Sequence, residues 1–364
     1  INNKKFIDET TRVSFKFNGH RFFGYKGDTL ASALLANNIH LVGRSFKYHR
    51  PRGFLGAGVE EPNAMVQLHE GDRSEPNIMA TEVELVEGLK AKSQNCWPSV
   101  KFDIGEINNI LNRFFPAGFY YKTFMWPKSF WFKVYEPFIR KAAGMGVAPL
   151  SPDPDRYEHN YEHCDVLVVG SGPSGLSSAL AAAKNGARVI LAEDKAHFGG
   201  SLLNDDVTIG NMSGREWASD VISQLKNMPN VVVKNRSQVF GYYDHNMTVM
   251  FERVSDHLEN SSKYTPRQRL HYIRAGEVIV STGSIERPIS FGNNDRPGIF
   301  LASAAREYMK VYETLVGKKP IIFTNNDSAY ATALEFIKND IKPIIIDTRD
   351  NSDGQLVKEV QEKG

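Results

Sequence analysis

Cysteine is nearly absent from this chain. Only Cys96 and Cys164 occur among its 364 residues. Two thiols exclude a disulfide-rich secreted scaffold, and they exclude any metal cluster held by four cysteines of this chain. The simplest interpretation is two free thiols in a reducing compartment. We therefore expect a cytoplasmic protein.

An excess of one charge and long apolar runs are also missing. The formal net charge is +2, which creates no large positive field, so no nucleic-acid partner is expected. No apolar run approaches the roughly 20 residues that cross a membrane. The first residues, Ile-Asn-Asn-Lys-Lys, lack the apolar core of a signal peptide. We expect a soluble protein with no membrane partner.

The chain is long enough for two or three domains, each with its own core. Its most informative stretch begins with Val166–Val169, an apolar run typical of a buried parallel strand. Alanine-rich helical sequence follows over Leu176–Lys184, and a second apolar run covers Arg188–Ala192 before two acidic residues. This order predicts a strand–helix–strand unit of the Rossmann type.

Three glycines separate the first strand from the helix in the pattern G-x-G-x-x-G. Gly170 permits the tight turn, Gly172 lets the backbone approach a pyrophosphate, and Gly175 lets helix and strand pack closely. The phosphates would be bound by the free N–H groups at the start of the helix, where Pro173 and Ser174 stand. The alternative is a glycine-rich turn in another α/β fold.

The acidic residues after the second strand bear on which nucleotide binds. Glu193 lies where a carboxylate can accept hydrogen bonds from an adenosine ribose. An acid there argues for a free 2′-hydroxyl, hence for NAD or FAD rather than NADP. Lys195, next to Asp194, weakens that argument because a cation can bind a 2′-phosphate. NAD and FAD both remain open, since they use the same backbone geometry.

Residues 1–95 have the pattern of a β-grasp module. Val13–Phe17 and Arg21–Tyr25 alternate as strands around an Asn-Gly pair, a strong hairpin signal. A helix is expected over Leu30–Asn37, and further strands over Ala64–Leu68 and Ala80–Leu85. This order resembles plant-type ferredoxin domains, in which the loop after the helix supplies cysteines to a [2Fe–2S] cluster.

The corresponding loop here, residues 44–63, contains no cysteine. Without thiolates it cannot hold the cluster, so we expect a structural module free of metal. The basic residues of the loop permit a phosphate- or partner-binding surface, and the alternative is a solvated or interface-lining loop. These residues are Arg44, Lys47, His49, Arg50 and Arg52.

Residues 96–160 form an expected connector that is rich in aromatic side chains. Interspersed lysines and prolines exclude a transmembrane helix. We expect the rings to pack against neighbouring domains or another subunit, and a base-stacking surface is the alternative. The rings are those of Phe114, Phe115, Phe119, Tyr120, Tyr121, Phe124, Trp126, Phe130, Trp131, Phe132, Tyr135 and Phe138.

The expected nucleotide-binding domain covers residues 161–316, and two later stretches would lie beside the nucleotide. Phe198–Leu202 places Gly200 and Ser201 in a flexible turn. An apolar strand from Glu277 closes on Thr282 and Gly283. In flavoprotein-like folds such a strand returns to the first sheet, which brings its glycine near the nucleotide.

A second strand–helix–strand unit begins in residues 317–364. Its turn, Asn325–Tyr330, has side chains where a working fingerprint has glycines, and Asp327 would repel a pyrophosphate. We expect a degenerate dinucleotide-binding domain that continues beyond Gly364. The expected fold class is therefore α/β: a β-grasp (ferredoxin-like, cluster-free) module, then two dinucleotide-binding (Rossmann-like) domains of the flavoprotein type.

Four stretches together resemble the alpha subunits of heterotetrameric sarcosine oxidases, and the resemblance covers nearly the whole chain. They are Arg50–Gly53 with Ala57–Asn63, Pro116–Phe124, Gly170–Gly175, and Ser281–Pro288 with Asp295–Phe300. The cysteine-free loop agrees with these subunits better than with the similar subunits of cyanide synthases and of opine or proline dehydrogenases, which often resemble cluster-bearing versions.

The resemblance implies one subunit of a larger complex. In that family the alpha subunit binds NAD, and the beta subunit oxidises sarcosine with FAD. Electrons pass to FMN at the alpha–beta interface and then to oxygen, which gives hydrogen peroxide. A C-terminal folate domain, outside this chain, transfers the methylene group to tetrahydrofolate. Gamma and delta subunits complete the complex, and delta carries zinc.

Carried onto this sequence, the resemblance implies a set of NAD contacts. They are Ser174 at the phosphates, Glu193, Asp194 and Lys195 at the ribose, Ser201 after the glycine pair, and Val239 or Phe240 near the adenine. No catalytic residue and no metal ligand are expected within the chain. Two alternatives stay open: a self-contained oxidoreductase with FAD at Gly170–Gly175, and a subunit of a related proline, opine or dimethylglycine dehydrogenase.

Overall fold

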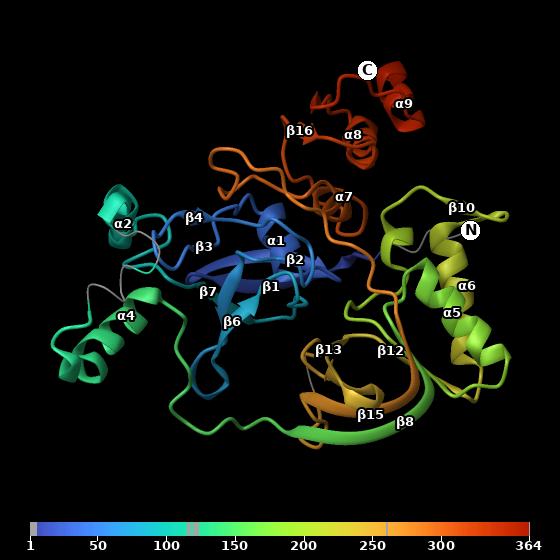
Figure 1. Ribbon diagram of the computed structural model, residues 1–364, viewed down its shortest axis with the longest axis horizontal. Helices are drawn as coiled ribbons and strands as arrows, with labels where there is room; N and C mark the ends of the chain where they lie inside the picture. Colours follow the sequence, from blue (N-terminus) through green and yellow to red (C-terminus); the bar gives the residue numbers. More distant parts are fainter. Residues whose placement is uncertain (1–5, 115–117, 119–123, 260, 364) are drawn as a thin grey trace. The chain divides into compact units, whose positions relative to one another are not determined.

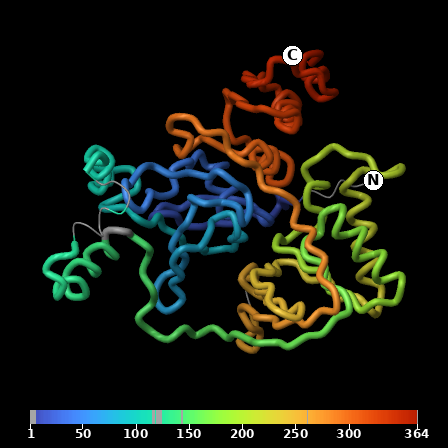
Figure 2. The backbone as a smooth tube through the Cα atoms, viewed as in Figure 1, coloured from blue at the N-terminus to red at the C-terminus, as the bar shows by residue number. Residues whose placement is uncertain are grey.

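The computed structural model describes residues 6–114, 118, 124–259 and 261–363. The chain forms two compact units (Figure 1). The first contains the residues up to Pro154 and those from Pro288 onward, and the second contains Asp155–Arg287. The chain thus leaves the first unit, builds the second and returns, as the tube in Figure 2 shows. The domain limits expected at residues 95, 160 and 316 stay predictions.

A five-stranded sheet of the β-grasp type lies at the centre of the first unit, in the order β2-β1-β7-β5-β6. The strands are β1 (Asp8–Phe17), β2 (His20–Lys26), β5 (Met65–Leu68), β6 (Glu75–Met79) and β7 (Leu89–Ser93). The β1–β2 hairpin turns at Asn18 and Gly19, whose φ angles of 51° and 82° suit this residue pair. The hairpin prediction is confirmed.

Helix α1 (Leu30–Ala36) begins where the sequence predicts it to begin. Thr29 Oγ1 accepts a hydrogen bond from the Ser32 N–H at 3.1 Å, and Ser32 Oγ accepts one from the Thr29 N–H at 3.0 Å. This reciprocal capping satisfies two N–H groups that the helix itself leaves without partners. Leu30 and Leu34 of α1 are fully buried in the core of the module.

One predicted strand of the module is wrong. Ala80–Leu85 forms turns with a single isolated bridge, and the strands β6 and β7 lie on either side of it. In β7, Leu89 and Ala91 are buried while Lys90 and Lys92 are exposed. The strand has little apolar sequence because only one of its faces meets the core.

Short elements complete the module and form the described part of the aromatic connector. They are β3 (Gly43–Arg44), β4 (Pro51–Arg52), η1 (Gly71–Arg73), η2 (Ile104–Glu106), α2 (Ile107–Ile110), η3 (Asn112–Phe114), η4 (Lys128–Phe130), η5 (Trp131–Tyr135) and α4 (Glu136–Ala143). Phe115, Phe119, Tyr120 and Tyr121 lie outside the described residues, as does most of the Pro116–Phe124 stretch.

A six-stranded sheet forms the second unit, in the order β12-β9-β8-β15-β14-β13. The strands are β8 (Tyr157–Val169), β9 (Val189–Ala192), β12 (Val231–Lys234), β13 (Ser237–Tyr243), β14 (Met247–Arg253) and β15 (Gln268–Val280). The first four strands in this order are parallel, and β15, β14 and β13 form an antiparallel meander. The predicted Rossmann-like fold is confirmed.

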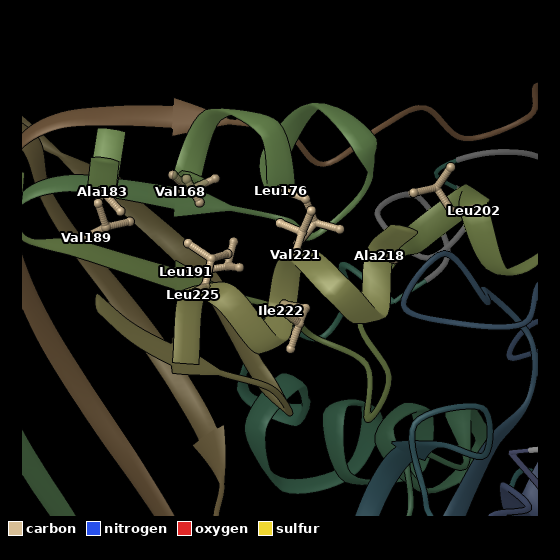
Figure 3. Packing of buried hydrophobic residues seen from close by; sticks show 11 residues of the cluster. Val168, Leu176, Ala183, Val189, Leu191, Leu202, Ala218, Val221, Ile222 and Leu225 are labelled. Carbon is tan, nitrogen blue, oxygen red and sulfur yellow. The ribbon is translucent and has the colours of Figure 1, made fainter. Parts of the chain in front are cut away.

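Two helices cover one face of the parallel strands: α5 (Pro173–Lys184) and α6 (Gly214–Lys226). Figure 3 shows the apolar side chains between them and the sheet. Leu176, Leu191 and Leu225 are fully buried there, and each buried leucine contributes about 1.5–3 kcal/mol. The small elements η6 (Gly200–Leu203), β10 (Thr208–Ile209), β11 (Met212–Ser213) and η7 (Asp244–Asn246) complete the unit.

The residues after Pro288 contain the predicted second strand–helix–strand unit. α7 (Ala302–Lys310) comes first, and β16 (Ile321–Thr324), α8 (Ser328–Lys338) and β17 (Ile344–Asp347) follow. The two strands pair in parallel, as a crossover through α8 requires. α9 (Gln355–Lys363) ends the described chain.

Candidate functional site

The glycine turn between β8 and α5 has the geometry that the sequence predicts for each glycine. Gly170 has a φ of 97°, and a Cβ there would lie 2.4 Å from the Ser281 carbonyl oxygen. A Cβ on Gly175 would lie 1.9 Å from the Gly170 oxygen. A Cβ on Gly172 would meet nothing within 4 Å. Two glycines therefore permit backbone packing, and the one between them faces open space.

The open space lies at the start of α5. Gly172 is the residue before the helix, Pro173 is its first residue, and no side chain caps this end within the described residues. Pro173 and Ser174 are exposed, whereas Gly175 is buried. The first N–H groups of a helix have no partner in the helix and lie at its positive end. An anionic ligand can bind there.

A second glycine turn lies directly against the first. Gly199 N–H donates to Ser171 Oγ at 3.1 Å, and a Cβ on Gly200 would lie 2.9 Å from Gly172 Cα. Ser201 follows at the exposed start of η6. The structure thus brings Gly200 beside Gly172, although 27 residues separate them in the sequence (200 − 172 − 1). It places Ser201 next to this contact.

Glu193 holds the glycine turn in place. Its side chain is buried, and Oε2 accepts hydrogen bonds from Ser171 N–H at 2.9 Å and from Ser171 Oγ. Oε1 accepts a hydrogen bond from Lys195 N–H at 3.1 Å. Burial and the neighbouring Asp194 carboxyl raise the pKa of Glu193. Both oxygens of Glu193 thus have partners inside the protein, and the neighbouring Asp194 is half-buried.

Strand β13 begins next to this acidic pair. Ser237 N–H donates to the Glu193 carbonyl oxygen at 2.7 Å, and Arg236 N–H donates to that of Lys195 at 3.0 Å. Two residues further on, Val239 packs into the core, whereas Phe240 is 59% exposed. The two residues expected near the adenine therefore present different surfaces, and only Phe240 offers a ring to solvent.

Thr282 and Gly283 lie at the same edge of the sheet as the glycine turn. β15 pairs with β8 up to Val280 and Val169, and the next residue, Ser281, donates its N–H to the Val169 oxygen at 2.8 Å. Thr282 and Gly283 are exposed, and Gly283 has a φ of 72°. Ligands of open α/β sheets bind at the carboxyl ends of the parallel strands, which is this edge.

The duplicate turn between β16 and α8 is filled by its own side chains. Asn326 Oδ1 accepts hydrogen bonds from Ser328 N–H at 3.0 Å and Ser328 Oγ at 2.6 Å. Asp327 forms an ion pair with Arg349 at 2.7 Å, and Arg349 also binds Asp347 at the end of β17. Here carboxylates and an amide take the donors that a pyrophosphate would need.

The basic loop of the first unit is bound internally. Arg44 Nη1 pairs with Glu106 at 2.9 Å and His49 Nδ1 with Asp103 at 2.6 Å. Arg50 pairs with Asp295 at 2.6 Å, and Arg52 contacts the same carboxylate. These side chains connect the loop to the connector and to the residues after Pro288. They join segments of the first unit.

Metal ligands do not gather in the structure. Among the described residues, no group of three or more His, Cys, Asp or Glu side chains could hold a metal ion. Burial raises the pKa of both thiols, that of Cys164 to about 11. No helix of the described residues is long and apolar enough to cross a membrane.

Comparisons with known proteins agree with this architecture. A model of 2Fe-2S iron-sulfur cluster binding domains matches residues 10–96, and a model of FAD dependent oxidoreductases matches residues 165–238. The structure of L-proline dehydrogenase from P. horikoshii aligns with a TM-score of 0.62 and 19% identity, over 98% of this chain and 57% of that one. At that identity the likeness concerns the fold alone.

Two relatives in sequence are sarcosine oxidase alpha subunits. The subunit of Rhizobium meliloti (strain 1021) is 50% identical over 344 residues, which are 94% of this chain and 35% of that protein. The subunit of Corynebacterium sp. (strain P-1) is 34% identical over 348 residues, which are 94% of this chain and 31% of that protein. The chain spans about a third of the length of these relatives.

The fold and the glycine turn define a protein that joins a ferredoxin-like module to a dinucleotide-binding domain of the FAD-dependent oxidoreductase type. Over the part that it spans, the chain is a homologue of the alpha subunits of sarcosine oxidase. The cluster named by the first family model does not fit these residues. The matched stretch contains one cysteine, Cys96, and it lies outside the loop at residues 44–63.

Proposed function

We propose that this chain is the NAD-binding part of the alpha subunit of a sarcosine oxidase. The observation that carries the proposal is the open space at Gly172, at the uncapped start of α5, in a homologue of sarcosine oxidase alpha subunits. A diphosphate needs free N–H groups and room for the backbone to approach it. This turn offers both, whereas in the duplicate turn Asn326 already accepts the N–H of Ser328 at the start of α8.

The residues around the turn would have distinct roles toward NAD. The N–H groups of Ser174 and Gly175 would bind the diphosphate, with Gly200 and Ser201 closing over it. Asp194 and Lys195 would bind the adenosine ribose, while Glu193 supports the turn from inside. A nicotinamide ring is capable of hydride transfer, but the proposed electron route runs from FAD to FMN and oxygen and does not use it. No residue of this chain is proposed to act in catalysis.

Four further residues are proposed to contact NAD at the edge of the site. Phe240 would stack on the adenine, because its ring is exposed beside the acidic pair. Val239 would contribute through its backbone, since its side chain packs inward. Thr282 and Gly283 would lie beside the nicotinamide half, at the carboxyl end of β15. Removing the Phe240 ring should weaken NAD binding without changing the fold.

The proposed complex oxidises sarcosine with oxygen and tetrahydrofolate to glycine, hydrogen peroxide and methylenetetrahydrofolate in the cytoplasm. We place the oxidation of the amine on FAD in the beta subunit, FMN at the alpha–beta interface, and folate in a part of the alpha subunit outside this chain. Gamma and delta subunits complete the complex. These assignments rest on the similarity to sarcosine oxidase alpha subunits. No nucleic acid or membrane takes part.

The connector offers a surface for a partner subunit. Large apolar side chains are exposed along it: Trp126 is 83% exposed, Phe132 81% and Phe114 76%. Isolated apolar residues on a surface are ordinary, but several large exposed apolar side chains in one segment favour an interaction site. Hydrogen exchange of residues 97–150 should slow when the partner subunits bind, and unchanged exchange would place their interface elsewhere.

FAD at the glycine turn is the second candidate, and the match of residues 165–238 to FAD-dependent oxidoreductases favours it. In that case the chain would be a flavoprotein by itself, or a subunit of a related proline, opine or dimethylglycine dehydrogenase. A flavin at this turn would still need an electron donor or acceptor. The turn at Asp327, which is filled by its ion pair with Arg349, offers no second nucleotide site for such a donor or acceptor.

One experiment separates the two candidates. The purified complex is denatured, and the released nucleotides are quantified by mass spectrometry beside the polypeptides that travel with the chain. The proposal expects one NAD per alpha chain. Substitution of Gly172 by valine should remove NAD and leave the flavins of the complex in place. Loss of FAD in that variant, with no NAD in the parent, would establish the second candidate.

A further inference from the structure

The loop that holds a cluster in ferredoxin domains is built around a carboxylate in this chain. Glu61 is 2% exposed. Its Oε2 accepts hydrogen bonds from Leu55 N–H at 2.6 Å and Gly56 N–H at 2.7 Å. Its Oε1 accepts hydrogen bonds from Asn63 N–H at 2.6 Å and Ala64 N–H at 3.1 Å. One side chain thus receives four backbone donors, two from the middle of the loop and two from its carboxyl end.

Four N–H groups directed at one point form a site for a negative charge. In iron–sulfur domains, hydrogen bonds of this kind reach the sulfur atoms of the cluster. In this chain the carboxylate is the acceptor, and such charge-assisted bonds are about twice as strong as neutral ones. Burial raises the pKa of Glu61, and its four hydrogen bonds oppose that rise. The loop therefore has its anion built in.

The other edge of the same loop is bound to the segment that returns from the second unit. Leu301 N–H donates to the Leu55 oxygen at 2.9 Å, and Tyr308 Oη donates to the Gly56 oxygen at 2.9 Å. Tyr308 is fully buried. The peptides at Leu55 and Gly56 are thus held by Glu61 through their N–H groups and by the 301–308 segment through their oxygens. A Cβ on Gly53 would lie 2.9 Å from Pro297 Cα, so the backbone of the loop also lies close to the returning segment at Gly53.

We propose that the Glu61 carboxylate takes the place of an iron–sulfur cluster as the buried anion that orders this loop. The ordered loop then binds the residues from Asp295 to Tyr308, so the module is a structural platform and carries no electrons. This proposal is independent of which nucleotide binds at Gly172. It also explains how the ferredoxin-like fold survives without the four ligands that its cluster requires.

Hydrogen exchange in the purified complex tests the role of Glu61. In the Glu61→Gln variant an NH2 group replaces one oxygen and faces two N–H donors, so their hydrogen bonds are lost. Exchange of residues 53–64 should become at least about tenfold faster. Glu60→Gln is the matched control, because Glu60 is half-buried and accepts hydrogen bonds from the N–H groups of Ala57 and Gly58 through one oxygen, Oε1. It should change exchange far less.

Iron and sulfide analysis tests the other half of the proposal on the unmodified protein. The module should contain neither, before and after anaerobic incubation with ferrous iron and sulfide, and should show no visible absorption beyond that of bound flavin. A cluster assigned to the alpha chain would overturn the proposal. So would exchange of residues 53–64 in the Glu61→Gln variant that is as slow as in the parent protein. The metal analysis remains decisive if that variant does not fold.

Discussion

At the scale of single residues, two glycines three positions apart have opposite surroundings. A Cβ on Gly172 would enter open space, whereas one on Gly175 would collide with the Gly170 oxygen at 1.9 Å. The sequence predicts the open space at Gly172 and the close packing at Gly175, because the G-x-G-x-x-G pattern encodes backbone geometry. It does not predict that Glu193 turns inward to Ser171, because that depends on a side-chain rotamer and on burial.

The contrast between these glycines yields a test of the site. Gly172 has φ −65° and ψ −177°, which any residue adopts, so Gly172→Val should keep the fold. Its side chain should occupy the place of the diphosphate and weaken binding at least about tenfold, or about 1.4 kcal/mol. Nucleotide content and thermal unfolding measure the two effects. Gly175→Ala should instead unfold the domain, and a Gly172→Val protein that retains its nucleotide would contradict the site.

A second prediction concerns the state of Glu193. Because its pKa is raised by burial and by Asp194, the carboxyl is held in its neutral form over a wider pH range than usual. Glu193→Gln keeps one acceptor and one donor, so it should retain nucleotide. Glu193→Ala leaves the buried Ser171 N–H without its acceptor and should cost roughly 1–3 kcal/mol of stability. Urea unfolding measures the stability of both variants. If Glu193→Gln loses as much stability as Glu193→Ala, Glu193 must be ionised in the parent protein.

At the scale of elements, the meander of the second unit contains a buried charge network. His271 on β15 is fully buried, with Nδ1 2.6 Å from Glu162 of β8 and Nε2 2.7 Å from Glu252 of β14. Lys234 of β12 lies 3.8 and 3.7 Å from the same carboxylates, and Arg269 lies 3.3 Å from Glu252. Both imidazole nitrogens face carboxylates, so the ring is charged and ties three strands together.

The pH dependence of the network follows from its pKa shifts. Burial alone would lower the pKa of His271, but its two carboxylate partners raise it above 6.5. Burial alone would raise the pKa of Glu252, but His271 and Lys234 lower it from 4.5 to about 2. The histidine contribution is complete below pH 6.5 and is lost as pH rises through its raised pKa. The glutamate contribution is complete above pH 4.5 and is lost as pH falls toward 2.

The contribution of this network should therefore be largest between pH 4.5 and 6.5. His271→Gln should cost about 1.5–3 kcal/mol, because each carboxylate loses a charged hydrogen bond from the ring while Lys234 and Arg269 stay near them, and should remove the decline in stability at alkaline pH. Urea unfolding from pH 3 to 9 measures this. His159→Gln, at an exposed position of β8, is the control. If the His271 variant still loses stability at alkaline pH as the parent does, other groups cause that loss.

Elements differ in how well the sequence predicts them. The parallel strands around the glycine turn are apolar on both faces and flanked by turn residues, so Val166–Val169 is evident. β7, with alternating lysines, has no apolar run and was missed. In β15 only the apolar end after Glu277 was predicted, because the burial of its polar half, with Arg269 and His271, depends on partners that are distant in sequence.

At the scale of the whole molecule, Asp295 joins two distant segments of the first unit. It accepts from Arg50 and Arg52, whose side chains are only 24% and 18% exposed. Asp295→Asn should destabilise the first unit by about 1–3 kcal/mol, since charged hydrogen bonds are lost, and should leave nucleotide binding in the second unit intact. Limited proteolysis and nucleotide content report on the two units. Asp350→Asn, an exposed position, is the control.

The return of the chain to its first unit sets an order of events on the ribosome. Asp155–Arg287 is contiguous, so the second unit is complete as soon as it emerges from the exit tunnel. The β-grasp module emerges earlier, but Leu55 and Gly56 must wait for Leu301 and Tyr308. During that interval Glu61 orders this part of the loop, beside the contacts of Arg44 with Glu106 and of His49 with Asp103. An internal anion therefore gives the nascent module a shape that does not depend on the delivery of a metal centre or on the rest of the chain.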